Sequence, residues 1–273
     1  METTASKFLG VKMRVKEVYE RLGISEKFFK ENSKTSPDDF IKILGEIENR
    51  IPEMNCRVVP SSFNPDDENL RAFPYTLSPS WNSCETALRA FGARGVMMRL
   101  PLFWQTESLL HSACRAVGAF IFLNETANMP VGALAIRVAE VATVVTDIND
   151  AYLFSSYLAE NKFPMGKTWI IVHPIKEGVR AIPEALMEKG IHVAQEVHVF
   201  PGVPVLDQCA NLWADKSTRF HVSDSYIHEN AGGGLLITSA ENEPMPFFRY
   251  HLSIPLRESG KCVCGKIIFE TKT

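Results

Sequence analysis

The sequence lacks a long apolar run, a strong charge of either sign and a secretory leader. No apolar stretch approaches the ~20 residues that a membrane helix requires. The net charge of −3 gives no basis for binding nucleic acid or an anionic membrane. The first residues contain no continuous apolar segment that ends in a small-residue cleavage site. We therefore expect a cytoplasmic protein without a nucleic-acid or membrane partner.

Cysteine is also sparse. Six cysteines in 273 residues show no regular spacing, so a disulfide framework is not expected, and the thiols are interpreted as reduced side chains or metal ligands. One pair is closely spaced, in the segment Cys262-Val263-Cys264-Gly265. Such a C-x-C pair before a glycine is compatible with a metal-binding turn.

Short apolar segments alternate with helical patterns through the middle of the chain. Apolar strands are expected at 95–100, 119–123, 141–145, 169–172 and 192–200, with helices near 83–91, 106–117, 131–138, 150–161 and 179–189. This order predicts an α/β fold with a mostly parallel sheet flanked by helices. Beyond residue 201 the pattern favours short antiparallel strands. We thus predict a helical segment over 1–55, an α/β core over 56–204 and a small antiparallel or barrel-like β subdomain over 205–273.

The strip from Gly232 to Gly265 resembles one known family. It reads GGGLLITSAENEPMPFFRYHLSIPLRESGKCVCG. It is similar to the end of the large domain of adenylate-forming enzymes, and specifically of the phenylacetate–coenzyme A ligase branch, where a GELVITS strand precedes NEAMPLIRYRTGD and a CxCG turn. The segment 58–76 likewise resembles the family's phosphate loop and the PYT that follows it. The resemblance implies an acyl-adenylating ligase fold that binds ATP, a carboxylic acid and coenzyme A.

Several nucleotide contacts of that family have no counterpart here. Ile254 stands where the family has the aspartate that holds the ribose. The phosphate loop needs glycines whose N–H groups converge on the phosphates, whereas Ser61–Glu68 has no glycine, one proline and three carboxylates. Ser61 and Ser62 remain as nucleotide-contact candidates, or they are simply turn formers. The family also has glycines in the segment that corresponds to 172–175, and this sequence has none there.

Three further positions match the family's nucleotide site. Phe200 could stack on adenine, as the first residue of the family's aromatic–Gly–x–x–Glu motif does. The segment Phe200-Pro201-Gly202-Val203-Pro204 lacks the final glutamate of that motif. Arg249 and Tyr250 match the family's RY pair. After the CxCG turn the resemblance implies a mobile lid domain that carries a catalytic lysine, and only Lys266 and Lys272 follow that turn. We expect the lid to be absent and ATP with Mg²⁺ not to bind.

A metal site is the feature that these losses leave intact. Cys262 and Cys264 can be joined by Cys209, which follows the last parallel strand, and by His221, in a segment similar to the family's GLHxxED stretch. Three thiolates and one imidazole suit a closed, structural Zn²⁺ site. The alternative is three ordinary thiols.

Three functions are compatible with these patterns. The first is a degenerate, noncatalytic relative of acyl/aryl-CoA ligases, acting as a binding or scaffolding subunit for a small carboxylic acid or coenzyme A. The second is a reduced acyl-adenylating enzyme whose lid comes from a partner chain, and the third is an unrelated α/β enzyme. A missing lid would expose a face near Arg249, Tyr250 and the chain terminus. We expect a homodimer or a partner protein there.

Overall fold

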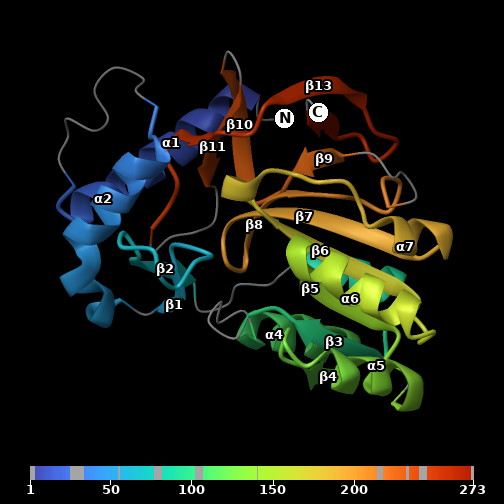
Figure 1. Cartoon of the computed structure of the whole chain (residues 1–273). Coiled ribbons are helices and arrows are strands. Elements are labelled where there is room, and N and C mark those ends of the chain that lie inside the picture. The colour runs from blue at the N-terminus through green and yellow to red at the C-terminus, as the bar shows by residue number, and fades with distance from the viewer. Residues whose placement is uncertain are drawn as a thin grey trace. The chain divides into compact units, whose positions relative to one another are not determined.

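A computed structural model describes residues 4–24, 34–54, 56–76, 82–101, 107–139, 141–213, 218–231, 234–239 and 245–271. The chain divides into two compact units, unit 1 (Met1–Pro79 and Val222–Leu256) and unit 2 (Ser80–His221 and Arg257–Thr273) (Figure 1). The predicted division at 55 and 204 does not coincide with these units, because strands beyond residue 205 pair with partners far away in the sequence. The glycine-rich turn at 232–233, the segment 240–244 and Lys272 lie outside the described residues.

Unit 2 is built on one nine-stranded sheet with the order β13-β14-β9-β8-β7-β6-β5-β3-β4. The strands are β3 (Gly95–Arg99), β4 (Phe120–Leu123), β5 (Thr143–Asp147), β6 (Thr168–Pro174), β7 (His192–Phe200), β8 (Val203–Asp207), β9 (Arg219–Val222), β13 (Leu256–Lys261) and β14 (Ile267–Thr271). The helices are α3 (Asn82–Ala90), α4 (Glu107–Val117), α5 (Met129–Val138), α6 (Ile148–Glu160) and α7 (Glu184–Glu188).

The predicted parallel sheet is confirmed. Every neighbouring pair in the order β4-β3-β5-β6-β7 is parallel, whereas β7 pairs antiparallel with β8 and β14 pairs antiparallel with β9. This strand order is that of doubly wound folds, in which the direction of winding reverses between β3 and β5. The antiparallel strands expected beyond residue 201 are present, and β8, β9, β13 and β14 extend the large sheet.

Apolar side chains from α5, α6 and α7 cover one face of the parallel strands. Phe154 and Leu158 of α6 and Leu186 of α7 pack with Trp169 of β6 in a shared core. Helix α7 is shorter than the segment 179–189 expected from the sequence. It begins at Glu184 because Pro183 disfavours helical backbone at the residue before it.

A buried ionic network closes the carboxyl ends of β3 and β5. Arg99 is fully buried, and its guanidinium donates to both carboxylate oxygens of Asp150 at 2.9 and 2.8 Å. The same guanidinium bonds the side chain of Asn124 and lies 3.8 Å from the centre of the Phe154 ring. Because a buried charge is tolerated only when it is fully paired, these contacts fix the register of the surrounding elements.

Unit 1 combines two helices with two small antiparallel sheets. Its elements are α1 (Thr4–Arg21), α2 (Pro37–Ile47), the 3₁₀ helix η2 (Glu48–Glu53), β1 (Cys56–Pro60), β2 (Ala72–Thr76), β10 (Tyr226–Ala231), β11 (Gly234–Ser239) and β12 (Tyr250–Leu252). Ser36 caps α2 by accepting from the Asp39 N–H at 3.1 Å, and Asp38 and Asp39 occupy its first turn. The core is an aromatic cluster in which Phe40 contacts Phe73, Phe247 and Tyr250.

Within the described residues, no helix combines the length and the apolar character that crossing a bilayer demands.

Candidate metal centre

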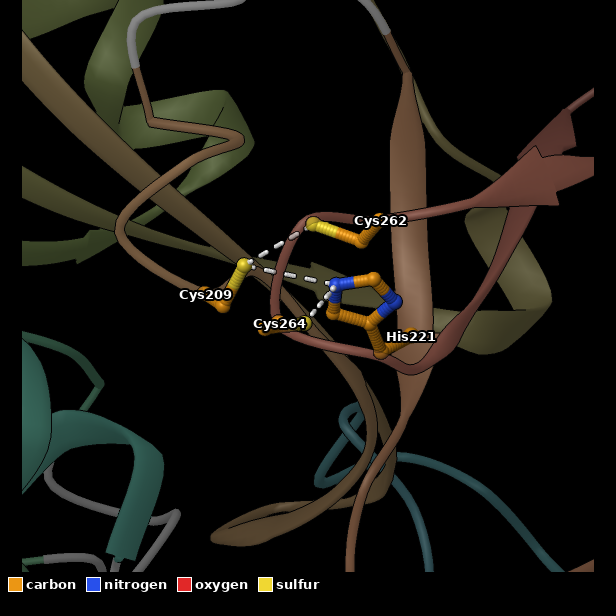
Figure 2. Close-up of side chains that lie close together, drawn as sticks. All are labelled: Cys209, His221, Cys262 and Cys264. Atoms are coloured by element: carbon orange, nitrogen blue, oxygen red, sulfur yellow. Dashed lines mark hydrogen bonds between the residues drawn. The ribbon is translucent and has the colours of Figure 1, made fainter.

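The four side chains selected from the sequence as a metal set come together in unit 2. Cys209 follows the end of β8, His221 lies on β9, and Cys262 and Cys264 occupy the turn between β13 and β14. Figure 2 shows the three sulfur atoms and the imidazole directed toward one another. The strand order β13-β14-β9-β8 explains this meeting, because it makes neighbours of segments that are some fifty residues apart in sequence.

The distances match those around a tetrahedral ion. Cys209 Sγ lies 3.6 Å from Cys262 Sγ, and His221 Nε2 lies 3.4 Å from the Sγ atoms of both Cys209 and Cys264. All four ligand atoms lie within 4.8 Å of one another. Ligands at the usual Zn–S and Zn–N lengths would be separated by about 3.6 to 3.8 Å. The sulfur separation is far longer than the ~2.05 Å of a disulfide. The group could hold a metal ion.

The tautomer of His221 is fixed by the backbone. Its Nδ1 lies 2.8 Å from the carbonyl oxygen of Ile267 on β14. A carbonyl oxygen can only accept, so Nδ1 carries the proton and the lone pair of Nε2 faces the sulfurs. Metal-bound histidines in proteins are oriented by hydrogen bonds of this kind. The sequence does not reveal this contact, because it involves a main-chain oxygen and depends on the pairing of β14 with β9.

A tight turn presents the two cysteines of the C-x-C pair. The Cys262 N–H donates to Lys266 O at 2.9 Å, and the Gly265 N–H donates to Cys262 O at 2.9 Å. Gly265 has a φ of 89°, in the left-handed region that favours glycine. The glycine after the second cysteine is therefore required by the turn that brings both sulfurs to the same point.

The electrostatics favour ionisation at one thiol first. Burial favours the neutral form of Cys262. Hydrogen bonds from the Cys264 backbone and from the side chains of Cys264 and Cys209 outweigh it and lower the pKa of Cys262 to about 6. Burial raises the pKa of Cys209 to about 11. One thiolate is thus available near neutral pH, and a cation at the centre would favour ionisation of the others.

The surroundings indicate a structural centre. Leu212 and Ile268 pack against Cys262 and Cys209, and Asn211 Nδ2 lies 3.8 Å from Cys209 Sγ. Four protein ligands fill a tetrahedral site and leave no position for a substrate. The centre can therefore join segments of chain, but it has no open position at which to activate water.

The two serines proposed as phosphate contacts accept hydrogen bonds from backbone N–H groups of their own loop. Ser61 Oγ accepts from the Arg71 N–H at 2.8 Å, and Ser62 Oγ accepts from the Asn64 N–H at 3.3 Å. Both serines are buried. They act as turn and loop acceptors here, and nucleotide contact by either serine stays a prediction.

The remaining candidates are also engaged within their own units. Phe200 is buried at the end of β7 in unit 2. In unit 1, Arg249 pairs with Glu229 at 3.0 Å, and Tyr250 is buried beside Phe40 and Phe247. The expected partner surface around Arg249 and Tyr250 stays a prediction.

The chain was compared with solved structures, and those it resembles are adenylate-forming ligases. A 2-hydroxyisobutyryl-CoA ligase in complex with R3-HIB-AMP is similar with a TM-score of 0.64 and 11% identity, over 94% of this chain and 62% of the ligase. An acyl-CoA synthetase/AMP-acid ligase II-like protein from Dyadobacter fermentans follows with a TM-score of 0.51 and 12% identity, over 89% of this chain and 66% of that protein. An o-succinylbenzoate CoA synthetase from Bacillus subtilis has a TM-score of 0.52 and 13% identity, over 79% of this chain and 48% of the synthetase.

These likenesses show the fold, which is that of acyl/aryl-CoA ligases. The chain spans 62% of the first of these ligases, so part of that enzyme has no counterpart in it. No protein-family model and no curated protein matches the sequence.

Proposed function

We propose that this chain is a zinc-stabilised relative of the phenylacetate–coenzyme A ligase branch that works as a noncatalytic binding or scaffolding subunit. The proposal joins two features of the molecule. The ligase fold is kept, whereas the loop at the place of the phosphate loop is closed on itself. The metal centre in turn holds the C-terminal strands on the sheet.

The observation that carries the proposal is the hydrogen bonding of residues 61–71. A phosphate loop works because several backbone N–H groups are left free to converge on the anion. Here the loop's own acceptors take those donors, namely the N–H groups of Ser61, Asn64, Asp66, Asp67, Asn69, Leu70 and Arg71. Binding a triphosphate would require these bonds to break. It would also bring the anion toward the carboxylates of Asp66, Asp67 and Glu68.

Ile254 supports the same conclusion at the ribose position. It is 3% exposed, so its apolar side chain is part of the interior of unit 1. A buried isoleucine cannot accept hydrogen bonds from ribose hydroxyls. We propose a small carboxylic acid or coenzyme A as the ligand. The parts of a ligase site that bind the acid and coenzyme A do not depend on the phosphate loop.

Zinc is the metal we propose for the Cys209, His221, Cys262 and Cys264 centre. Three thiolates and an imidazole form a soft donor set that suits Zn²⁺ and is unsuited to Mg²⁺ or Ca²⁺. Cys209, His221 and Cys262 would hold the ion from the interior side, and Cys264 would complete it from the surface. The ion would supply no reaction chemistry and would stabilise the junction of β8, β9 and the β13–β14 turn.

Calorimetric titration with MgATP tests the loss of the nucleotide site. We expect a Kd of about 1 mM or weaker, equivalent to a binding free energy of about −4 kcal/mol or less. A known acyl-CoA ligase titrated under the same conditions serves as the positive control. Micromolar affinity for MgATP would contradict the proposal, because it would require a phosphate site that the loop bonding does not provide.

The second candidate is an acyl-adenylating enzyme that obtains its missing part from another polypeptide. The observation in its favour is the fold, which resembles that of a 2-hydroxyisobutyryl-CoA ligase with a TM-score of 0.64. Pyrophosphate release from ATP, measured with a panel of carboxylic acids and with a separately added ligase lid domain, distinguishes the two. Acid-dependent release would favour this candidate over a noncatalytic subunit.

A further inference from the structure

Strand β4 forms an outer edge of the large sheet, and its own four residues offer no protection for that edge. It is the last strand in the sheet order, and among the described residues no other strand pairs with its outer side (Figure 1). Its four residues, Phe120-Ile121-Phe122-Leu123, include no charge and no proline. Proteins usually protect such an edge with lysine, proline, a bulge or a covering segment. An apolar edge of this kind is a template for pairing with another strand.

The hydrogen bonds to β3 show which backbone groups face outward. The Phe120 N–H donates to Arg94 O at 2.9 Å, and the Asn124 N–H donates to Met98 O at 3.0 Å. Along a strand in a parallel pair, the N–H groups of alternate residues face the same neighbour. The N–H and C=O groups of Ile121 and Leu123 therefore face away from β3, along the free edge.

Helix α5 continues the apolar surface beside this edge. Val131, Leu134 and Val138 are 42%, 46% and 69% exposed, and their spacing places them on one stripe of the helix. Phe120 is 52% exposed, and its ring lies over Gly95 on the neighbouring strand. Several large apolar side chains exposed on neighbouring elements mark an interaction site more often than an isolated one does.

We propose that this edge pairs with the same edge of a second copy of the chain, antiparallel about a two-fold axis that passes by Phe122. Ile121 then lies opposite Leu123 of the second copy, and Leu123 lies opposite Ile121 of the second copy. Each of these pairs can exchange two N–H···O bonds, because the groups that face outward on one copy meet those that face outward on the other. The two sheets join into one, with α5 beside α5 of the second copy.

A second copy fits this edge because the edge is complementary to itself. A two-fold interface uses one patch twice, so each apolar side chain meets an apolar partner. The charges at the two ends of the strand also match. Exposed Arg94 and Arg115 lie beside the start of β4, and exposed Glu125 follows its end. Antiparallel pairing brings the basic end of one copy to the acidic end of the other.

The size of the patch sets the strength to expect. A four-residue strand and one stripe of a ten-residue helix bury less than the ~800 Å² per partner of a standard interface. The dimer should therefore be reversible, with a Kd of about 10 µM. It uses a surface of unit 2 and is independent of the ligand that the chain binds.

Sedimentation velocity of the full chain between about 1 and 200 µM tests the pairing. Leu123→Pro removes one outward N–H and leaves the bonds to β3, since proline is tolerated where the N–H faces away from the sheet. We expect it to weaken the dimer at least tenfold, whereas Leu123→Val should leave it intact. Val138→Lys, at an exposed helix position, should weaken it as well by placing like charges together.

Leu153→Lys provides the matched control for the helix variant. Leu153 is 61% exposed on α6, away from the free edge, so this change should leave the dimer unchanged. A wild-type chain that stays monomeric at 200 µM would overturn the proposal. So would a dimer that persists in both Leu123→Pro and Val138→Lys, or one that Leu153→Lys weakens equally.

Discussion

At the scale of single residues, burial sets the protonation state of a histidine in the large sheet. His173, on β6, is fully buried, and its Nε2 lies 3.0 Å from Gln195 Oε1 on β7. Within the described part of the chain, neither its Nδ1 nor the Gln195 amide nitrogen has a hydrogen-bond partner. Burial lowers the pKa of His173 to about 4, and nearby Arg180 and His198 act in the same direction. The folded protein therefore holds this imidazole neutral.

This residue should make stability depend on pH in a defined window. In the unfolded chain His173 titrates at its ordinary pKa of about 6.5. Between that value and about 4 the unfolded state binds the proton and the folded state does not. The free energy of unfolding should therefore fall as the pH is lowered through this window, by up to about 3 kcal/mol.

Urea denaturation at pH 7 and pH 4.5, of wild type and His173→Gln, isolates the effect. The variant keeps a polar partner for Gln195 and has no titratable group at this position. It should lose less stability than wild type on acidification, since all other groups are the same in both proteins. An equal loss in the two proteins would show that the acid sensitivity has another source.

The cluster of Cys209, His221, Cys262 and Cys264 could be predicted from the sequence, and the buried network could not. Cys262 and Cys264 have a spacing that is informative by itself, and Gly265 completes the turn. Arg99 ends a strand and Asp150 lies near the start of a helix. Nothing in their local sequence says that they meet. That contact depends on the parallel pairing of β3 with β5, which is set by the tertiary packing of the whole sheet.

At the scale of elements, the proposed metal centre would join segments whose own pairing is limited. The cross-strand pairs between β14 and β9 are Phe269 with Phe220 and Glu270 with Arg219. By contrast, β6 and β7 pair along seven residues, from Thr168 with His192 to Pro174 with His198. The parallel strands should therefore hold together without a metal, whereas β9, β13 and β14 depend on it more strongly.

Hydrogen exchange before and after chelation tests this difference. We expect amides of β9, β13 and β14 to exchange at least about tenfold faster without metal, equivalent to about 1.4 kcal/mol of local stability. Amides of β5 and β6 should keep their protection. The reason is that metal binding stabilises only the structure that the metal requires.

Two cysteine variants separate the metal from thiol chemistry in general. Cys209→Ser should reproduce the effect of chelation, whereas Cys56→Ser, in unit 1 and outside the cluster, should not. Uniform loss of protection across the whole sheet after chelation would contradict a local role for the centre.

The elements themselves were largely predictable, because their signals are local. The alternation of apolar strands and helices predicted the parallel sheet. The boundaries of the compact units were not predictable in the same way. The strip after residue 205 contributes β9, β13 and β14 to the large sheet and β10, β11 and β12 to a separate sheet. Which sheet a short strand joins depends on partners elsewhere in the chain, as for β14, which pairs with β9 some fifty residues earlier.

At the scale of the whole molecule, the ligase fold and the ligase chemistry rest on different sets of residues. The fold rests on many apolar contacts, so it persists at 11% identity with a 2-hydroxyisobutyryl-CoA ligase. Nucleotide binding rests on a few groups, and here the loop at 61–71 uses its own N–H groups while Ile254 is buried. A chain can therefore keep the architecture and lose the activity, which is the basis of the noncatalytic function we propose.

The zinc centre is the claim on which this account depends most directly, and X-ray absorption at the zinc edge tests it in the intact, purified chain. We predict one zinc per chain, with three sulfur ligands at about 2.3 Å and one nitrogen at about 2.1 Å. Replacing Cys209 with serine should remove the metal or replace one sulfur by oxygen or nitrogen. A chain purified without chelators that holds no zinc, or holds zinc with only oxygen and nitrogen ligands, would contradict the account.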